Sequence, residues 1–373
     1  MHVVSVFGTR PEAIKMAPVV RALEQTDGID STVILTGQHR EMLTQVTELF
    51  GIRSDANLDV MQQSQGLTHI TAAVLKGLEP LLADLQPDCV LVHGDTTTTM
   101  AAALAAFYQQ IPVGHVEAGL RTGDVTSPWP EEMNRKIAGA MTSVHFAPTE
   151  RAAENLLAEN VCEDKIEVTG NTAIDALCWV REHVLDAPGV AEEMAEAFPW
   201  LDRDKRLILV TGHRRENHDG GIAEICHAMR DLAGRGDVQI VYPVHLNPKV
   251  QAVAQEVVGT TLDVHLIAPL NYRPFAWLME RSDLIITDSG GIQEEAPSLG
   301  KPVLVTRDTT ERPEAVEAGT VRLVGADAPR IVEEAERLLD NATAYAAMAQ
   351  THNPYGDGHA AGRICKRLFR DFC

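Results

Sequence analysis

The sequence predicts a two-domain α/β protein built on parallel β-sheets. Short runs rich in valine, isoleucine and leucine alternate with longer alanine-rich stretches of helical spacing along all 373 residues. Most of the short runs are continuously apolar, which is typical of strands buried on both faces of a parallel sheet. Strand–helix alternation of this kind needs right-handed crossover connections. The chain length and the 45% content of hydrophobic residues favour two domains over one.

The predicted strands fall into two sets separated by an acidic, alanine-rich stretch. The first set comprises residues 3–7, 32–35, 89–93, 112–116 and 144–147. The second set comprises residues 207–211, 240–244, 264–267, 284–287, 302–305 and 322–324. Residues 186–206 between the sets are expected to hold a connecting helix. We therefore expect a first domain at 1–168, a second at 171–352, and a C-terminal helix within 354–373 that returns to the first domain.

Composition narrows the classes of partner. A formal net charge of −21 argues against binding to nucleic acid or to an anionic membrane surface. The apolar run at residues 2–7 is too short for a signal peptide, and no stretch approaches membrane-spanning length. Six cysteines are scattered without a Cys-x-x-Cys pair, which favours buried thiols over a disulfide framework or a zinc site. These features predict a cytoplasmic protein.

The most informative local pattern is a strand, a glycine turn and a helix. The strand at 284–287 leads through one aspartate into Ser289-Gly290-Gly291. Backbone N–H groups at a helix start bind phosphate oxygens, and the glycines let a ligand approach closely. Glu295 follows one turn later, where a carboxylate can accept the hydroxyl protons of a ribose. We therefore predict a nucleoside diphosphate site here, the alternative being an ordinary turn beside a solvated glutamate.

The loop after the first strand carries two cations. Arg10 lies at the turn, and Lys15 lies in the first turns of the helix that follows. Ligands of open parallel sheets bind beyond the carboxyl ends of the strands, so both side chains are candidates for ligand contact. A strand cap and a surface lysine are the simpler interpretations. The loop has one glycine and no G-x-G-x-x-G pattern, which argues against a bound NAD.

Three acidic side chains of the first predicted domain are candidates for acid–base chemistry. Asp95 and Glu117 come just past the third and fourth predicted strands, which places both at the mouth of the sheet. The alternative for Asp95 is a helix cap, whereas Glu117 precedes a glycine loop. A proline-rich loop then enters a helix with Glu131 and Arg135 at i and i+4, a spacing that also fits a simple helix ion pair.

Cations follow strands of the second set as well. His213 and Arg214 come directly after a strand and a glycine. Arg312 precedes a proline-started helix, where a cation is unfavourable for the helix dipole. Together with Arg10 and Arg135, these groups can offset the charge of a diphosphate on an otherwise acidic protein.

Taken in order, these loops resemble the bacterial non-hydrolysing UDP-N-acetylglucosamine 2-epimerases over essentially the whole chain. The matching motifs are Phe7-Gly8-Thr9-Arg10-Pro11-Glu12, His93-Gly94-Asp95-Thr96-Thr97, Val116-Glu117-Ala118-Gly119-Leu120-Arg121-Thr122, Pro130-Glu131-Glu132-x-Asn134-Arg135, Gly212-His213-Arg214-Arg215-Glu216-Asn217, Thr287-Asp288-Ser289-Gly290-Gly291-x-Gln293-Glu294-Glu295-Ala296 and Thr310-Glu311-Arg312-Pro313-Glu314. The resemblance implies an isomerase with two Rossmann-like domains facing a central cleft (the GT-B type). It also implies a homodimer and a reaction without NAD. The lack of a Cys/His ligand cluster in the sequence predicts that no metal is needed.

The resemblance implies reversible inversion at C2 of UDP-N-acetylglucosamine, which gives UDP-N-acetylmannosamine for cell-surface polysaccharide. UDP is eliminated across C1–C2 to leave a 2-acetamidoglucal and is then added back. The implied catalytic residues are Asp95, Glu117, Glu131, Arg135 and His213. The implied substrate contacts are Arg10, Lys15, Phe275, Ser289, Gly290, Gly291, Glu295 and Arg312. Clustered carboxylates can split their pKa values to remove and return a proton, but the residues leave open which carboxylate does which.

Some members of this family bind a second UDP-N-acetylglucosamine as an activator beside the active site. The positions that match this second site are Gln38, His39, Glu132, Arg214 and His245. Glu41 stands where some regulated relatives have a glutamine. The competing interpretation is that these polar groups form only an interdomain hydrogen-bond network.

Three other kinds of protein share parts of the pattern. A GT-B glycosyltransferase has the same nucleotide site, but it needs an acceptor surface that is often basic, which a net charge of −21 does not favour. A non-catalytic UDP-sugar sensor has no need of Asp95, Glu117 and Glu131 together. A closer alternative is a 2-epimerase of a modified UDP-sugar, such as a diacetamido-uronic acid, because discrimination among sugars depends on pocket shape.

Overall fold

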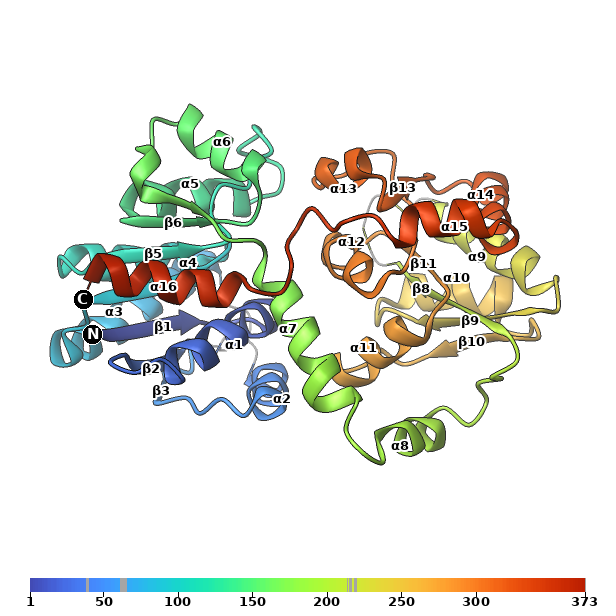
Figure 1. The fold of residues 1–373 in the computed structure, drawn as a ribbon, viewed down its shortest axis with the longest axis horizontal. Coiled ribbons are helices and arrows are strands. Elements are labelled where there is room, and N and C mark those ends of the chain that lie inside the picture. Colours follow the sequence, from blue (N-terminus) through green and yellow to red (C-terminus); the bar gives the residue numbers. More distant parts are fainter. Residues whose placement is uncertain (38–39, 61–65, 213, 215–216, 218–219, 373) are drawn as a thin grey trace. The chain divides into compact units, whose positions relative to one another are not determined.

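The computed structural model describes residues 1–37, 40–60, 66–212, 214, 217 and 220–372, which form two compact units. The first unit comprises Met1–Cys178 and Tyr355–Cys373, and the second comprises Trp179–Pro354. Each unit is a parallel sheet with helices packed against it (Figure 1). The predicted α/β class with two parallel-sheet units is therefore confirmed. The chain passes between the units within one helical stretch, α7 (Thr172–Val180) and η2 (Arg181–Leu185), later than the boundary predicted near 170.

The first sheet has β1 near its centre and the strand order β3-β2-β1-β4-β5-β6-β7. Its strands are β1 (His2–Phe7), β2 (Asp30–Leu35), β3 (Ala56–Asn57), β4 (Cys89–His93), β5 (Val113–Val116), β6 (Val144–Ala147) and β7 (Ile166–Val168). The five predicted strands are present, but β3 and β7 were not predicted. Both lie at the edges of the sheet and are only partly buried, so they lack the continuous apolar run that marks the central strands.

The helices of the first unit follow its strands in turn. They are α1 (Arg10–Glu24), α2 (Arg40–Phe50), α3 (Leu67–Leu85), α4 (Thr97–Tyr108), α5 (Glu131–Met141), α6 (Glu150–Ala158), the short turn η1 (Glu163–Lys165), α7 and α16 (Ala360–Phe372). The C-terminal helix α16 packs against α1, so the tail of the chain returns to the first unit.

The second sheet has the strand order β10-β9-β8-β11-β12-β13. Its strands are β8 (Arg206–Thr211), β9 (Val238–Pro243), β10 (Val264–Ile267), β11 (Leu284–Thr287), β12 (Val303–Val305) and β13 (Val321–Leu323), all of them predicted within two residues at each end. Its helices are α8 (Val190–Ala197), α9 (Gly221–Ala233), α10 (Pro248–Val258), α11 (Tyr272–Arg281), α12 (Gly290–Glu295), η4 (Ala296–Leu299), α13 (Pro313–Ala318), α14 (Ala328–Asp340) and α15 (Ala342–Ala349).

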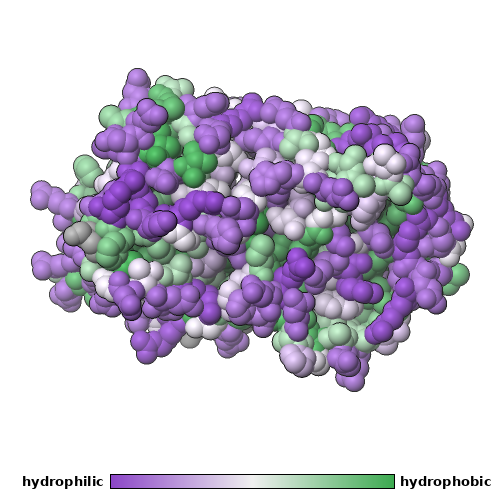
Figure 2. All heavy atoms as spheres, in the orientation of Figure 1, coloured by the Kyte–Doolittle hydropathy of each residue, from purple (hydrophilic) through white to green (hydrophobic). Residues whose placement is uncertain are grey.

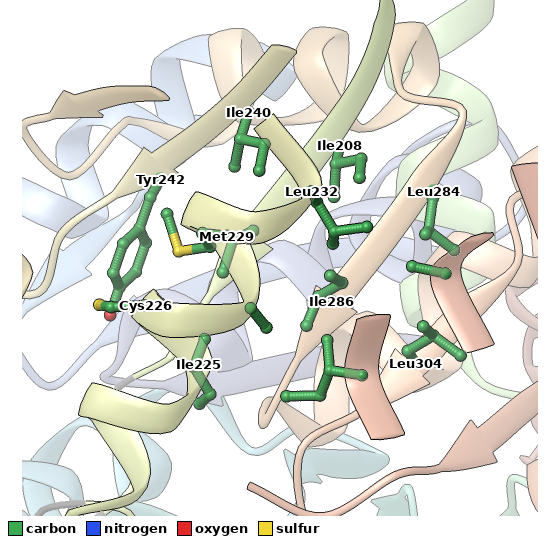
Figure 3. Packing of buried hydrophobic residues seen from close by; sticks show 14 of the residues in the cluster. Ile208, Ile225, Cys226, Met229, Leu232, Ile240, Tyr242, Leu284, Ile286 and Leu304 are labelled. Atoms are coloured by element: carbon green, nitrogen blue, oxygen red, sulfur yellow. The ribbon is translucent and has the colours of Figure 1, made fainter. Parts of the chain in front are cut away.

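The core of the second unit forms where α9 packs on the sheet (Figure 3). Met229 and Leu232 on α9 belong to one buried cluster with Ile208, Ile240 and Ile286 on the strands, and all five side chains are buried. Each such apolar side chain contributes roughly 1.5–3 kcal/mol by leaving water. Burial of the strands on this face fixes where their carboxyl ends emerge, and the candidate site residues follow those ends.

One face of the molecule is dominated by polar and charged groups. The face in Figure 2 is mostly hydrophilic, with hydrophobic residues in small separate patches. Among the residues that the structure describes, no helix is both long and apolar enough to cross a membrane. Cys89, Cys226 and Cys365 are buried as expected, but Cys162 and Cys178 are exposed.

A buried carboxylate on α7 holds the start of α16. Asp175 accepts hydrogen bonds from the backbone N–H groups of Ala360, at 3.2 Å, and Ala361, at 2.8 Å. These N–H groups belong to the first turn of α16 and have no partner within that helix. A carboxylate from a distant segment therefore acts as the helix cap.

We expect Asp175→Ala to lower the free energy of unfolding of the first unit by about 1–3 kcal/mol, because two buried N–H groups lose their acceptor. Urea denaturation and proteolysis near the C-terminus measure this loss. Asp357→Ala is the control, because it removes only exposed interactions, an ion pair with Arg363 and a hydrogen bond from the backbone N–H of His359, and should cost at most about 1 kcal/mol. Equal effects of the two substitutions would contradict the capping role.

Candidate active site

A buried glutamate ties together two loops at the carboxyl ends of β1 and β4. The carboxylate of Glu12, 2% exposed, accepts from the backbone N–H groups of Gly8 at 3.0 Å and Thr9 at 2.7 Å. It also accepts from the hydroxyls of Thr96, at 2.6 Å, and Thr99, at 3.2 Å. Burial raises the pKa of Glu12, and these hydrogen bonds oppose that rise. Glu12 was not among the predicted site residues, although Thr9-x-x-Glu12 is a capping-box pattern.

Glu117 lies at the centre of a group of polar side chains just past β5. Lys15 on α1 donates to its Oε2 atom, and Asn171 donates to the same atom at 3.1 Å. Glu117 has a positive φ of 62°, which is unusual for a residue with a side chain and is often found at functional sites. Lys15 is therefore an ion-paired side chain at the mouth of the sheet and not a solvated surface lysine.

Asp95 and Arg135 form a second ion pair in the first unit. Arg135 Nη2 donates to Asp95 Oδ2 at 2.5 Å, and Asn134 donates to the Asp95 carbonyl at 3.0 Å. Asp95 does not cap α4, because Thr96 is the N-cap residue and accepts from Thr99. The Asp95 side chain is 29% exposed, so it remains accessible to a ligand.

The two neighbouring glutamates at the start of α5 differ. Glu131 is half-buried, and its carboxylate has no hydrogen-bond or ion-pair partner within the described part of the chain, so the helix ion pair with Arg135 does not form. Glu132 is fully buried and accepts from Arg135 at 3.1 Å and from the backbone of Thr122 and Gly123. Glu132 thus holds Arg135 and the loop after β5, whereas Glu131 is available to a ligand.

The predicted glycine turn joins β11 to α12 in the second unit. Ser289 is the N-cap residue of α12, and its backbone N–H donates to Thr287 Oγ1 at 2.9 Å. A Cβ atom at Gly290 would lie 3.0 Å from Cζ of Arg312, so a side chain here would push the guanidinium back by a few tenths of an ångström. Gly290 thus lets Arg312 lie close against the turn, in addition to the close approach of a ligand that the sequence predicted.

Asp288 connects the glycine turn to the loop after β8. Its buried Oδ2 atom accepts from the backbone N–H of Arg214 at 2.9 Å and from the side chain of Asn217 at 3.2 Å. Asn217 donates to the carbonyl of Thr306 at 3.3 Å as well. Three loops at the carboxyl ends of β8, β11 and β12 are thereby held together.

Three arginines of the second unit surround one glutamate. Glu311 accepts from Arg214 and Arg307 at 3.2 Å each and from Arg312 at 3.3 Å. Burial acts to raise the pKa of Glu311, but these arginines lower it to about 2. Arg312 is also bound by the buried carboxylate of Glu294 at 2.8 Å. Arg307 was missed by sequence reasoning because no motif marks it; Thr310-Glu311-Arg312 was the only nearby signal.

The remaining predicted contacts are less constrained. Glu295 is half-buried, and Tyr272 donates to its carboxylate at 3.4 Å. Phe275 is half-buried on α11, and Arg10 at the start of α1 has no partner within the described residues. His245 is exposed, and its Nδ1 accepts from the backbone of Asn247 at 3.1 Å. Gln38, His39 and His213 lie outside the described residues.

Each unit therefore has its own polar cluster at the carboxyl ends of its strands. The first unit presents carboxylate–cation pairs, and the second presents a glycine turn beside arginines. Among the described residues, no three His, Cys, Asp or Glu side chains are grouped so that they could hold a metal ion. Two Rossmann-like α/β units of this kind define the GT-B class of fold.

Comparison with known proteins identifies the family. The profile of the family described as UDP-N-acetylglucosamine 2-epimerase matches residues 21–369. The UDP-N-acetylglucosamine 2-epimerase of Escherichia coli K12 is 60% identical over 369 residues, which cover 99% of this chain and 98% of the relative. The chain therefore belongs to the UDP-N-acetylglucosamine 2-epimerase family, and it is an enzyme of the isomerase class.

Solved structures agree with this assignment. The Neisseria meningitidis UDP-GlcNAc 2-epimerase bound to UDP-GlcNAc matches with a TM-score of 0.92 and 52% identity, and the match covers both chains completely. The Methanocaldococcus jannaschii enzyme in complex with UDP-GlcNAc and UDP matches with a TM-score of 0.81 and 34% identity, covering 99% of this chain and 100% of the other. The resemblance seen in the sequence motifs is thus confirmed at the level of the family.

We expect Glu311→Gln to destabilise the second unit by about 1–3 kcal/mol at neutral pH, because the three arginines lose their shared anion. The pKa of Glu311 is depressed, so its contribution is fully present above the ordinary value of 4.5 and is lost as the pH falls toward about 2. Urea denaturation at about pH 7, 5 and 3 should therefore show the difference between wild type and variant shrinking with acid. Glu192→Gln, at an exposed acidic position on α8, should leave stability unchanged. A difference for Glu311→Gln that is independent of pH would contradict the assignment.

Proposed function

We propose that this enzyme interconverts UDP-N-acetylglucosamine and UDP-N-acetylmannosamine by eliminating UDP and adding it back to a 2-acetamidoglucal intermediate. One observation carries the proposal: the three candidate carboxylates of the first unit lie in three different environments. Asp95 is bound by Arg135, Glu117 by Lys15, and Glu131 has no partner in the described residues. A reaction that removes a proton from one face of C2 and returns it to the other needs acids and bases of unequal strength.

Recognition of UDP is proposed for the second unit. The Ser289–Gly291 turn offers backbone N–H groups to the diphosphate, and Arg312 lies directly against this turn. Glu295 would accept the ribose hydroxyls, and Phe275 would contact the uracil. Arg214 and His213 would stabilise the departing diphosphate by charge-assisted hydrogen bonds.

The sugar is proposed to meet the residues of the first unit. The C2 hydrogen is weakly acidic because no carbonyl stands next to it, so cleavage of the C1–O bond must lead its removal by building positive charge on the ring. Asp95, Glu117 and Glu131 supply the candidates for the base and for the acid that returns the proton, with Arg10, Lys15 and Arg135 balancing charge on the diphosphate and the carboxylates. Exclusion of water keeps the glycal and UDP together until re-addition.

The chemistry proposed is redox-neutral and is carried out by protein side chains, so we propose that neither NAD nor a metal takes part. We further propose that the enzyme acts in the cytoplasm as a homodimer and supplies activated N-acetylmannosamine for cell-surface polysaccharide. The second candidate is epimerisation of a modified UDP-sugar such as a diacetamido-uronic acid, since the same clusters would act on either sugar. A GT-B glycosyltransferase is disfavoured by the family assignment.

A regulatory site is proposed from Gln38, His39, Glu132, Arg214 and His245. Arg214 contributes to the arginine cluster through Glu311, so a second UDP-N-acetylglucosamine that touches Arg214 would act directly on the first site. Glu132 would act only through Arg135, because its carboxylate is fully buried. The competing interpretation remains a hydrogen-bond network without a second ligand.

Proton NMR in D2O tests the proposed reaction. The wild-type enzyme with UDP-N-acetylglucosamine should form the manno epimer with deuterium at C2, without added nicotinamide or metal and without free sugar.

Asp95→Asn and Glu131→Gln should each reduce turnover by at least about 100-fold and leave UDP affinity nearly unchanged. Glu295→Gln should instead weaken UDP binding by on the order of 1.5–3 kcal/mol, measured by calorimetry. Turnover only with the diacetamido-uronic sugar would favour the second candidate, and epimerisation without deuterium at C2 would exclude the mechanism.

Initial rates of the reverse reaction test the regulatory site. Because coupling between two ligands is reciprocal, UDP-N-acetylmannosamine alone should react slowly at first and accelerate when a trace of the gluco epimer is present. His245→Ala should remove this acceleration while leaving UDP affinity unchanged. If the manno substrate reacts at full rate alone, with hyperbolic kinetics in both directions, no second site operates.

A further inference from the structure

One buried histidine beside the candidate carboxylates has no role in the reaction proposed above. His93 is the last residue of β4, and its side chain is 4% exposed. Neither ring nitrogen has a hydrogen-bond partner within the described part of the chain. Buried polar atoms are almost always paired, so this imidazole has two hydrogen-bonding nitrogens that the described residues leave unused.

The position of His93 directs its ring at Glu117. β4 and β5 pair in register with His93 opposite Val116, so Glu117 is the next residue along the neighbouring strand. The distance from His93 Nε2 to Glu117 Oε2 is 3.9 Å, about 1 Å too long for a hydrogen bond. The strand end is rigid, because the carbonyl of His93 accepts from Thr99 Oγ1 at 2.5 Å. Closing the gap therefore requires only a small rotation of the two side chains.

The charges around the ring favour its neutral form, which keeps one N–H to donate. Burial lowers the pKa of His93 to about 4, and Glu117 acts in the opposite direction. Lys15 from α1 and His115 from β5 lower the pKa further, whereas Asp95 raises it. A neutral imidazole with its proton on Nε2 can donate to a carboxylate without carrying a charge into the buried site.

We propose that His93 is a positioning residue that donates Nε2–H to Glu117 Oε2 when Lys15 leaves that atom for the diphosphate of the substrate. Lys15 and Asn171 now share Oε2, and Lys15 is the member of the pair that the proposed function assigns to the substrate. Without a replacement donor, the departure of Lys15 would leave Glu117 buried with one partner fewer and would favour its protonation. His93 keeps Glu117 ionised and oriented during the step in which the sugar is bound.

The inference rests on the proposed function, but its test does not need turnover. The protonation of Glu117 is followed by NMR of protein labelled with 13C-glutamate, with UDP bound, and its signal is assigned by its loss in Glu117→Gln. His93→Phe keeps a ring and removes the donor, so the titration midpoint of Glu117 should rise by about 0.5–1 pH unit. His93→Gln retains an N–H donor and should restore a midpoint close to that of wild type.

His145→Phe is the matched control, because His145 is also a buried histidine, on β6, with burial lowering its pKa to about 3. It should leave the Glu117 midpoint unchanged. An unchanged midpoint in His93→Phe, or an equal rise in His145→Phe, would overturn the proposal.

A second measurement covers the case in which His93→Phe does not fold. In wild-type protein labelled with 15N-histidine, UDP should move the His93 Nε2–H signal downfield as the hydrogen bond forms, and an unmoved signal would overturn the proposal. Failure of the proposed reaction would show separately, as absent deuterium incorporation by the wild-type enzyme.

Discussion

Buried carboxylates that accept backbone N–H groups hold the loops at the carboxyl ends of both sheets, and the candidate sites depend on them. Glu12 joins the loops after β1 and β4, and Asp288 joins the loop after β8 to the turn after β11. Glu132 does the same for the loop after β5. Each of these anions accepts from at least two N–H groups at once, so removing one would leave those donors without their acceptor. The loops are consequently fixed before any substrate arrives.

This arrangement leaves the cations of the site paired with carboxylates that a substrate can replace. Arg135 is held by Asp95 and Glu132, Lys15 by Glu117, and the arginines of the second unit by Glu311. On a protein with a net charge of −21, the internal carboxylates keep these cations in place and neutralised. Under the proposed function, binding of the diphosphate would exchange these anionic partners, which costs less reorganisation than assembling separate cations around a new charge.

The pairing also gives the three candidate carboxylates of the first unit different environments. Asp95 faces a guanidinium, Glu117 faces an ammonium and an amide, and Glu131 has no partner within the described residues. Their protonation therefore responds differently to the arrival of one ligand. A site with unequal carboxylates suits a reaction that takes a proton from one face of a carbon and delivers it to the other.

The sequence by itself determined the α/β class, the central strands of both sheets and the loops that carry the chemistry, because each depends on a local pattern. Continuous apolar runs marked the strands, and the polar residues that follow them marked Asp95, Glu117 and the Ser289–Gly291 turn. Only the tertiary structure decided the partners: Glu12 across two loops, Arg307 within the arginine cluster, Asn171 on Glu117 and His93 beside it. The Glu12–Thr96 and Glu117–Asn171 contacts join residues 84 and 54 positions apart. Arg307 lies only four residues before Glu311, but the cluster also includes Arg214, which is 97 positions from Glu311. No periodicity records which side chains meet across a sheet. Gly290 shows the division most clearly, since its motif signalled a ligand, whereas its close contact with Arg312 follows only from the packing of the fold.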